Sequence, residues 1–101
     1  MASLGVALLG SSAGAQDTNF PPEQIRKGAA VFALNCATCH GKRMRNPQWA
    51  IDLKMFPRNE HSRFVDSVTY GKRNMPSWED VLNPDDIEAL WSYVVAGEQD
   101  D

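Results

Sequence analysis

The chain has 101 residues, 43% of them apolar, and a formal net charge of −3. This small and mixed charge argues against a nucleic-acid-binding protein, and no apolar run is long enough to cross a membrane. We therefore expect one small monomeric domain with a marginal core, because a chain of this size buries only roughly 60 to 65% of the surface that its unfolded form exposes. A large bound group would complete such an interior.

The first fifteen residues are typical of the end of an export signal. They carry no charged side chain, and a short apolar stretch is followed by small residues that place Ala13 and Ala15 in the positions of an A-x-A cleavage site. The positively charged region that normally begins such a signal is missing, so a plain terminal extension is the alternative. We expect residues 1–15 to be a signal-peptide remnant, residues 16–101 to form the domain, and the protein to be periplasmic.

Three segments have the periodicity of amphipathic helices. The first runs from the turn at Pro21–Pro22 into the stretch that contains the cysteines, and the second covers residues 59–71, with Asn59 as N-cap and a glycine at its end. The third covers residues 83–97, with Asn83 as N-cap and a proline at the first helical position. Residues 41–57 show no sustained period, and no segment alternates with period two. We therefore predict an all-α domain whose irregular middle part wraps around a bound group.

Residues 35–42 read NCATCHGK and contain both cysteines of the chain. A disulfide or a thioredoxin-like redox pair is one interpretation, but such a pair usually follows a strand, and here a helix precedes it. A zinc site of Cys36, Cys39 and His40 is a second, but adjacent ligands are poorly spaced for one tetrahedral ion. In the third, the two thiols add to the vinyl groups of one porphyrin and the imidazole of His40 binds its iron. We favour this third interpretation, one covalently bound haem c.

His40 leaves the opposite axial position of the iron to another ligand, and the candidates are Met44, Met55, Met75 and His61. Met44 is only four residues from His40, too close to reach the other face of the haem easily. Met55 stands in the irregular stretch, where a methionine more often fills a core. Met75 lies between a helix-ending glycine and a proline, in a loop stiff enough to hold a weak thioether ligand. We predict His40 and Met75 as the iron ligands, with Met55 as the alternative to Met75. A His/Met pair raises the reduction potential relative to two histidines and leaves no open position for oxygen or substrate.

The stretches KGAAVFALNCATCHG, GKRNMPSW and LNPDDIEALWSYVV together resemble the class I c-type cytochromes, and the resemblance covers nearly all of residues 16–101. It implies a cytochrome c fold of three to four helices wrapped around one covalently attached haem, with the first and last helices crossing. A glycine and an aromatic residue of one helix would then meet a leucine and an aromatic residue of the other, here Gly28, Phe32, Leu90 and Tyr93. It also implies an electron carrier and not an enzyme.

The same resemblance implies further contacts with the haem. The family uses the carbonyl of a proline after the haem motif to fix the tautomer of the proximal histidine, and Pro47 is the candidate here. Trp49 and Trp78 can donate indole N–H groups to the haem propionates, and Arg45 can pair with one of them. Packing of these side chains against the porphyrin edge without hydrogen bonds is the alternative.

The second half of the chain, residues 56–98, is similar to periplasmic cytochromes that accept electrons from quinoprotein (PQQ-dependent) alcohol dehydrogenases. This similarity implies a carrier of the respiratory chain with two redox partner proteins, a dehydrogenase as donor and a terminal oxidase as acceptor. Two other functions stay open. One is a haem domain of a larger respiratory or dehydrogenase complex, and the other is a haem-based sensor or enzyme with a labile sixth ligand.

Basic side chains flank both predicted iron ligands, whereas acidic ones gather in residues 79–88 and in the last five residues. The basic residues are Lys42, Arg43, Arg45, Lys72 and Arg73. If they surround the exposed haem edge, they steer a partner with an acidic rim onto the haem at rates that fall with salt. Ala37 and Pro76 would then form the short apolar contact with the partner. A surface with scattered charge is the alternative.

Overall fold

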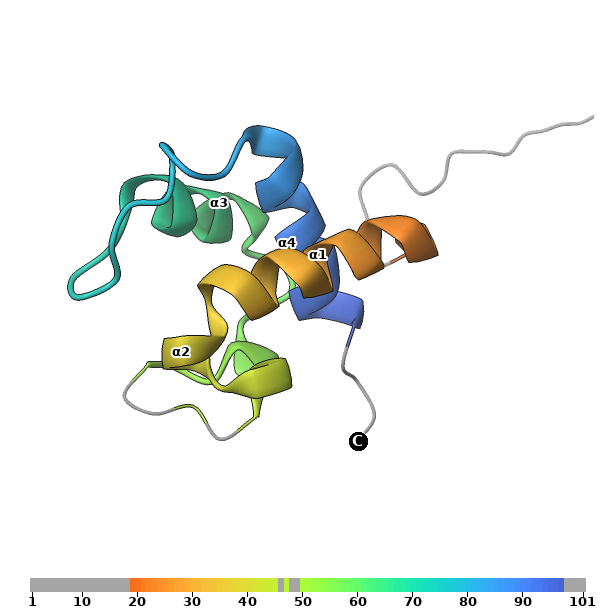
Figure 1. Cartoon of the computed structure of the whole chain (residues 1–101), viewed down its shortest axis with the longest axis horizontal. Helices are drawn as coiled ribbons and strands as arrows, with labels where there is room; N and C mark the ends of the chain where they lie inside the picture. The colour runs from red at the N-terminus through yellow and green to blue at the C-terminus, as the bar shows by residue number, and fades with distance from the viewer. Residues whose placement is uncertain (1–18, 46, 48–49, 98–101) are drawn as a thin grey trace, which may run out of the picture.

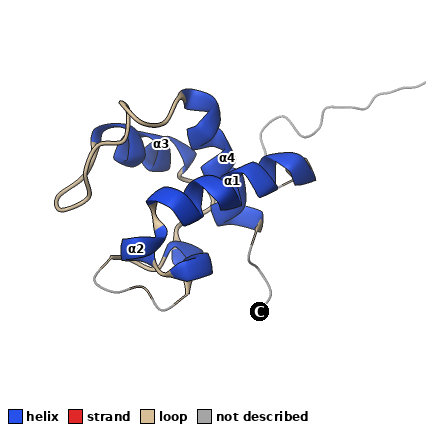
Figure 2. Ribbon diagram, viewed as in Figure 1, coloured by secondary structure: helices blue, strands red, loops and turns tan. Residues whose placement is uncertain are grey.

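The computed structural model describes residues 19–45, 47 and 50–97 of the chain. Its helices and short 3-10 turns, in chain order, are α1 (Pro22–Asn35), α2 (Ala37–His40), η2 (Lys42–Met44), η3 (Leu53–Met55), α3 (His61–Tyr70) and α4 (Pro84–Ala96). Figure 2 shows helices and loops in the described part and no strand, although an isolated bridge pairs Lys72 with Met75. The all-α prediction is therefore confirmed for these residues.

Two of the sequence predictions fall outside the described residues. These are the signal-peptide remnant at residues 1–15 and the haem contact of Trp49. Among the helices that the structure does describe, none is long and apolar enough to cross a membrane.

The helix ends follow local sequence signals, with one exception. Asn83 caps α4 through a reciprocal capping box: its side-chain oxygen accepts a hydrogen bond from the N–H of Asp86 (2.8 Å), and the Asp86 carboxylate accepts one from the N–H of Asn83 (3.0 Å). The N-cap predicted at Asn59 is wrong, because α3 begins two residues later. Asn59 lies in a turn that the N–H of Glu60 closes by donating to the carbonyl of Pro57 (3.2 Å), so the helix starts only after this turn.

The first and last helices cross at close range (Figure 1). Gly28 of α1 is buried at the crossing, where an added Cβ atom would lie 2.7 Å from the carbonyl carbon of Ala89 and 2.8 Å from Cβ of Tyr93. Phe32, one turn further along α1, packs on Tyr93 with ring centroids 5.3 Å apart. Leu90 is buried in the same core. The predicted crossing is confirmed, although the residue nearest to Gly28 is Ala89, which the sequence analysis did not single out.

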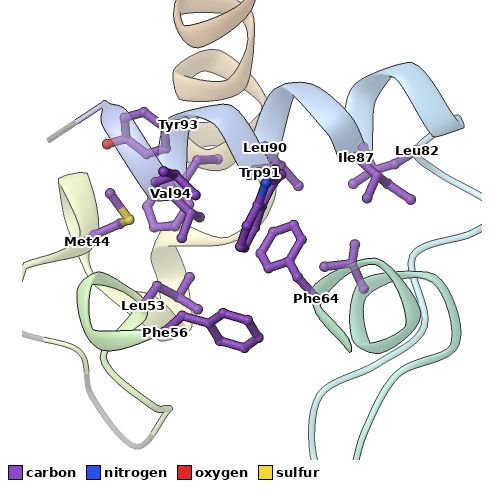
Figure 3. Packing of buried hydrophobic residues seen from close by; sticks show 13 residues of the cluster. Met44, Leu53, Phe56, Phe64, Leu82, Ile87, Leu90, Trp91, Tyr93 and Val94 are labelled. Atoms are coloured by element: carbon purple, nitrogen blue, oxygen red, sulfur yellow. The ribbon is translucent and has the colours of Figure 1, made fainter. Parts of the chain in front are cut away.

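Aromatic side chains connect α4 to the middle of the chain. Trp91 extends from α4 toward Phe64 of α3 and toward Phe56, which follows η3 (Figure 3), and its ring centroid lies 5.1 Å and 6.1 Å from theirs. Leu53 of η3 and Met44 of η2 belong to the same buried cluster. Because α1, α3 and both 3-10 turns pack on α4 or its core, α4 is the central element that positions the two segments described next.

Candidate functional site

The two cysteines lie where α1 ends and α2 begins. The N–H of Cys36 donates to the carbonyl of Phe32 (2.8 Å), and the carbonyl of Cys36 accepts from the N–H groups of Cys39 (3.2 Å) and His40 (3.0 Å). This turn ends at Gly41, whose φ of 88° lies in the left-handed region that favours glycine. Both thiols and the imidazole therefore come from one helical turn, and the buried helix α1 fixes its direction.

The environment of the thiols bears on the alternatives considered for the motif. Cys36 and Cys39 are both free thiols, partly buried. Burial, together with the neighbouring Cys39, raises the pKa of the Cys36 thiol to about 11. A redox-active cysteine needs the opposite shift, because the thiolate is the reactive form. Nor do three or more His, Cys, Asp or Glu side chains gather anywhere in the described ranges in a way that would hold a metal ion, so the zinc site considered above is not formed there.

His40 is buried, and one ring nitrogen has a defined partner. Its Nδ1 lies 3.1 Å from the carbonyl oxygen of Ile51. Burial lowers the pKa of His40, and the Ile51 carbonyl opposes this shift by stabilising the protonated ring. The neutral ring thus donates a hydrogen bond from Nδ1–H to the Ile51 carbonyl. Its Nε2 lone pair stays available to bind a metal ion.

The assignment of this backbone partner to Pro47 is therefore wrong. The carbonyl that meets His40 belongs to Ile51, eleven residues after the histidine. The contact forms across a loop, and the side chain of Ile51 takes no part in it. A carbonyl that any residue could supply leaves no residue-type signal, which is why the sequence analysis missed it.

The three methionines considered as the second axial ligand of the iron have different environments. Met44 is 1% exposed and fills the core, whereas Met55 is 77% exposed. The expectation that Met55 is the core filler is wrong, because the buried side of η3 is occupied by Leu53 while Met55 points outward. Met75 is partly buried and packs against the core cluster.

A short hairpin holds Met75. The N–H of Lys72 donates to the carbonyl of Met75 (3.0 Å), and the N–H of Met75 donates back to the carbonyl of Lys72 (2.9 Å). Gly71 begins the hairpin with a φ of 83°, and a Cβ atom on it would lie 2.8 Å from the carbonyl oxygen of Met75. The chain after the hairpin is tied to the end of α3, since the Ser77 hydroxyl donates to the carbonyl of Thr69 (2.6 Å). These bonds agree with the rigid loop expected from the sequence.

His61, the remaining ligand candidate, is engaged elsewhere. Its Nε2 lies 2.9 Å from both carboxylate oxygens of Glu88, and its ring packs on Trp91 with centroids 5.3 Å apart. These contacts join the beginning of α3 to α4. His61 therefore has a structural partner on α4, which accounts for its place in the fold without a metal ion.

The predicted haem contacts and charges can be located only in part. Trp78 is partly buried against the core cluster, and its backbone N–H donates to the carbonyl of Val68 (2.9 Å). Arg45 is partly buried and has a partner in the structure. Lys42, Arg43, Lys72 and Arg73 are exposed. Figure 1 shows α2 and the hairpin of residues 72–75 at the same end of the long axis of the molecule, on the left.

Comparisons with known proteins cover the same part of the chain. Residues 23–94 match the family model described as "Cytochrome C oxidase, cbb3-type, subunit III". Cytochrome c6 of Microcystis aeruginosa is 36% identical over 74 residues, which are 68% of this chain and 91% of that protein. No solved structure gives a significant match.

Two longer proteins match through a small part of their length. The cbb3-type cytochrome c oxidase subunit FixP of Azorhizobium caulinodans is 36% identical over 75 residues, or 68% of this chain and 26% of that protein. The quinohemoprotein alcohol dehydrogenase ADH IIB of Pseudomonas putida is 28% identical over 89 residues, or 85% of this chain and 13% of the enzyme. What this chain shares with these two is one domain.

Proposed function

Because the chain belongs to the cytochrome c family whose model is described as the subunit III of cbb3-type cytochrome c oxidase, we propose that it shuttles single electrons between a periplasmic dehydrogenase and a terminal oxidase. The coarser function follows from the family: the chain is a c-type cytochrome electron carrier with one haem. The observation that carries the proposal is the single turn of Cys36, Cys39 and His40, with Nδ1 of the histidine occupied by a carbonyl.

The residues of this turn suit a c-type haem. Cys36 and Cys39 lie within one helical turn and supply the two sulfur atoms for thioether bonds. His40 is neutral and buried and turns Nδ1 toward Ile51, so that Nε2 can bind iron. The bound haem supplies reversible one-electron chemistry, and the protein supplies its orientation, its axial ligands and its burial.

We assign the two axial positions to His40 and Met75. Four observations support Met75: the hairpin bonds that hold it, the engagement of His61 with Glu88, the full burial of Met44 and the outward direction of Met55. Thioether sulfur favours the ferrous state, so this pair gives a higher potential than two histidines. With both residues bound to the iron, no position would be open for a substrate, and one-electron transfer is the chemistry that the haem would supply. Arg45 and Trp78 are proposed to contact the propionates.

The donor is proposed to be a quinoprotein alcohol dehydrogenase. The support is twofold: the likeness of residues 56–98 to carriers of that kind, and the match of this chain to a domain of an enzyme named as a quinohemoprotein alcohol dehydrogenase. The proposed periplasmic location rests on the signal-like residues 1–15. We propose a monomeric carrier, and the match to cytochrome c6 over 91% of that protein supports the carrier function.

A haem domain of a larger complex is the second candidate function. The matches to FixP and to ADH IIB favour it, because in both the similar part is a fraction of a longer protein. The native form distinguishes the two functions. A carrier is released from the periplasm as a small protein that carries haem, whereas a domain of a complex copurifies with the other redox centres.

Stopped-flow mixing tests the proposed donor. The oxidised protein, mixed with a reduced quinoprotein alcohol dehydrogenase, should be reduced in a second-order reaction at least as fast as the enzyme turns over. A matched mixture with an NAD-linked alcohol dehydrogenase should give no reduction. If the quinoprotein enzyme also fails to reduce it, the donor assignment is wrong, while the haem and its ligands are unaffected by that result.

A further inference from the structure

Arg58 lies in the turn between η3 and α3 and is partly buried. Its guanidinium donates to three backbone carbonyls: Nη1 to those of Lys54 (3.2 Å) and Phe56 (2.9 Å), and Nη2 to that of Val95 (3.3 Å). The first two carbonyls belong to residues 51–56, which we call the proximal segment. The third belongs to Val95 in the last turn of α4, 37 residues after Arg58. One side chain therefore ties the proximal segment to the end of α4.

The end of α4 is a favourable place for this cation. The last four carbonyls of a helix have no partner within it, and the C-terminal end carries a partial negative charge. The last turn of α4 contains no basic residue of its own. The planar fork of Arg58 can serve several acceptors at once, which a lysine ammonium on a flexible stem does less well. The sequence gives no local sign of this contact, since the two partners are far apart along the chain.

The proximal segment needs an anchor because of what Ile51 does. Its carbonyl accepts a hydrogen bond from Nδ1–H of His40, yet the residue is 59% exposed, so burial does not hold its backbone in place. The anchors follow in the next residues: Asp52 caps η3 with its side chain, and Leu53 and Phe56 are buried against the core. The guanidinium of Arg58 closes the segment at its far end.

We propose that Arg58 is a positioning residue for His40, acting through the proximal segment. This inference rests on the proposed function, in which His40 is an iron ligand. By holding the Ile51 carbonyl on the Nδ1 proton, Arg58 keeps the imidazole oriented and basic, and a more basic ligand stabilises ferric iron. Without the guanidinium, the hydrogen bond from Nδ1 to the Ile51 carbonyl opens more often. The imidazole then becomes less basic and donates less electron density to the iron. The reduced form is then favoured, although Arg58 touches neither the haem nor the histidine.

The experiment compares Arg58→Met with Arg63→Met in the haem-loaded protein. Arg63 is a matched control, since its guanidinium lies 4.7 Å from the centre of the Phe56 ring and pairs with the Glu60 carboxylate (2.7 Å). One readout is the exchange rate of the His40 Nδ1 proton, measured by NMR on ferrous protein with nitrogen-15-labelled histidine. The other is the reduction potential.

Arg58→Met should speed Nδ1 exchange about tenfold, as expected for the loss of hydrogen bonds from a charged donor. At a fixed electrode potential, the ratio of reduced to oxidised protein should also be several-fold higher for this variant than for the wild type. Arg63→Met should leave both readouts unchanged. Arg58→Lys keeps the charge but loses the fork, and should lie between the wild type and Arg58→Met.

The amide proton of Leu90, at the α1–α4 crossing, reports global unfolding. If Arg58→Met speeds exchange at Leu90 and His40 equally, Arg58 is a general stabilising residue and the inference is wrong. Unchanged exchange at His40 would also overturn it. If the wild-type spectrum shows that His40 does not bind the iron, the proposed function fails as well, and this result is visible before any variant is made.

Discussion

The crossing of α1 and α4 and the two segments that carry the assigned iron ligands are built by different physical means. At the crossing, Gly28, Phe32 and Tyr93 are buried against one another, and side-chain packing determines the geometry. The turn before Gly41 and the hairpin after Gly71 depend instead on backbone hydrogen bonds and on glycines with positive φ. We infer that the crossing sets the stability of the domain, whereas the two segments set the chemistry at the iron.

This difference predicts that substitutions separate into two classes. Changes at the crossing should lower the free energy of unfolding and leave the spectrum of the folded protein intact. Changes in the ligand segments should alter the spectrum or the electron-transfer rate at a smaller cost in stability. The following three predictions test the division, in order of decreasing effect on stability.

Gly28→Val should cause the largest loss of stability. The added side chain meets the backbone of Ala89, which cannot rotate away, so overpacking should cost about 3 kcal/mol of unfolding free energy. Denaturant titration measures this, and Ala30→Val, on the exposed side of the same helix, is the control. The absorption spectrum of the folded variant should match that of the wild type. If the two variants were equally stable, the inference that the crossing is the main source of stability would be wrong.

Gly71→Ala should lower the free energy of unfolding less than Gly28→Val does, and it should change the absorption spectrum. Gly71 has φ 83° and ψ 166°, a region that is essentially restricted to glycine, so a residue with Cβ there costs roughly 1 to 3 kcal/mol. The new methyl group would also press on the carbonyl of Met75. The sulfur-to-iron charge-transfer band of the ferric protein should therefore weaken. A variant that loses stability and keeps the full band would show that the hairpin does not position Met75.

Replacing both Lys72 and Arg73 by glutamate should have the smallest effect on stability, since both side chains are exposed. It should slow reduction by a donor with an acidic rim, and the decrease of the rate with ionic strength should disappear. Arg26→Glu with Lys54→Glu, at two exposed basic residues outside the group that flanks the predicted ligands, is the matched control for charge. If both double variants behave alike, docking uses another face and the charges are scattered.

The parts of the fold that the sequence predicted are those with a local signal. The helix ending at Cys36, the capping box at Asn83 and the crossing residues Phe32 and Tyr93 each follow from a short-range pattern or a family stretch. The N-cap at Asn59 was wrong because a tight turn occupied that residue first.

The misses in the site have a common cause. Ile51 meets His40, and Arg58 meets Val95, through backbone carbonyls brought together by the fold. Every residue type has the same backbone carbonyl, so the pattern of side chains cannot predict which carbonyl will be the acceptor. Met55 was assigned to the wrong environment because a 3-10 turn within an irregular stretch is too short for a side-chain period to show which side is buried.

The central claim is that His40 and Met75 close both axial positions of the iron, and a carbon monoxide titration of the ferrous protein tests it most directly. The wild type should bind no carbon monoxide at neutral pH, Met75→Ala should bind one equivalent, and Met55→Ala, which alters an exposed methionine, should behave as the wild type. Binding by the wild type would mean that the sixth position is open. Failure of Met75→Ala to bind, or binding by Met55→Ala, would mean that another residue is the ligand.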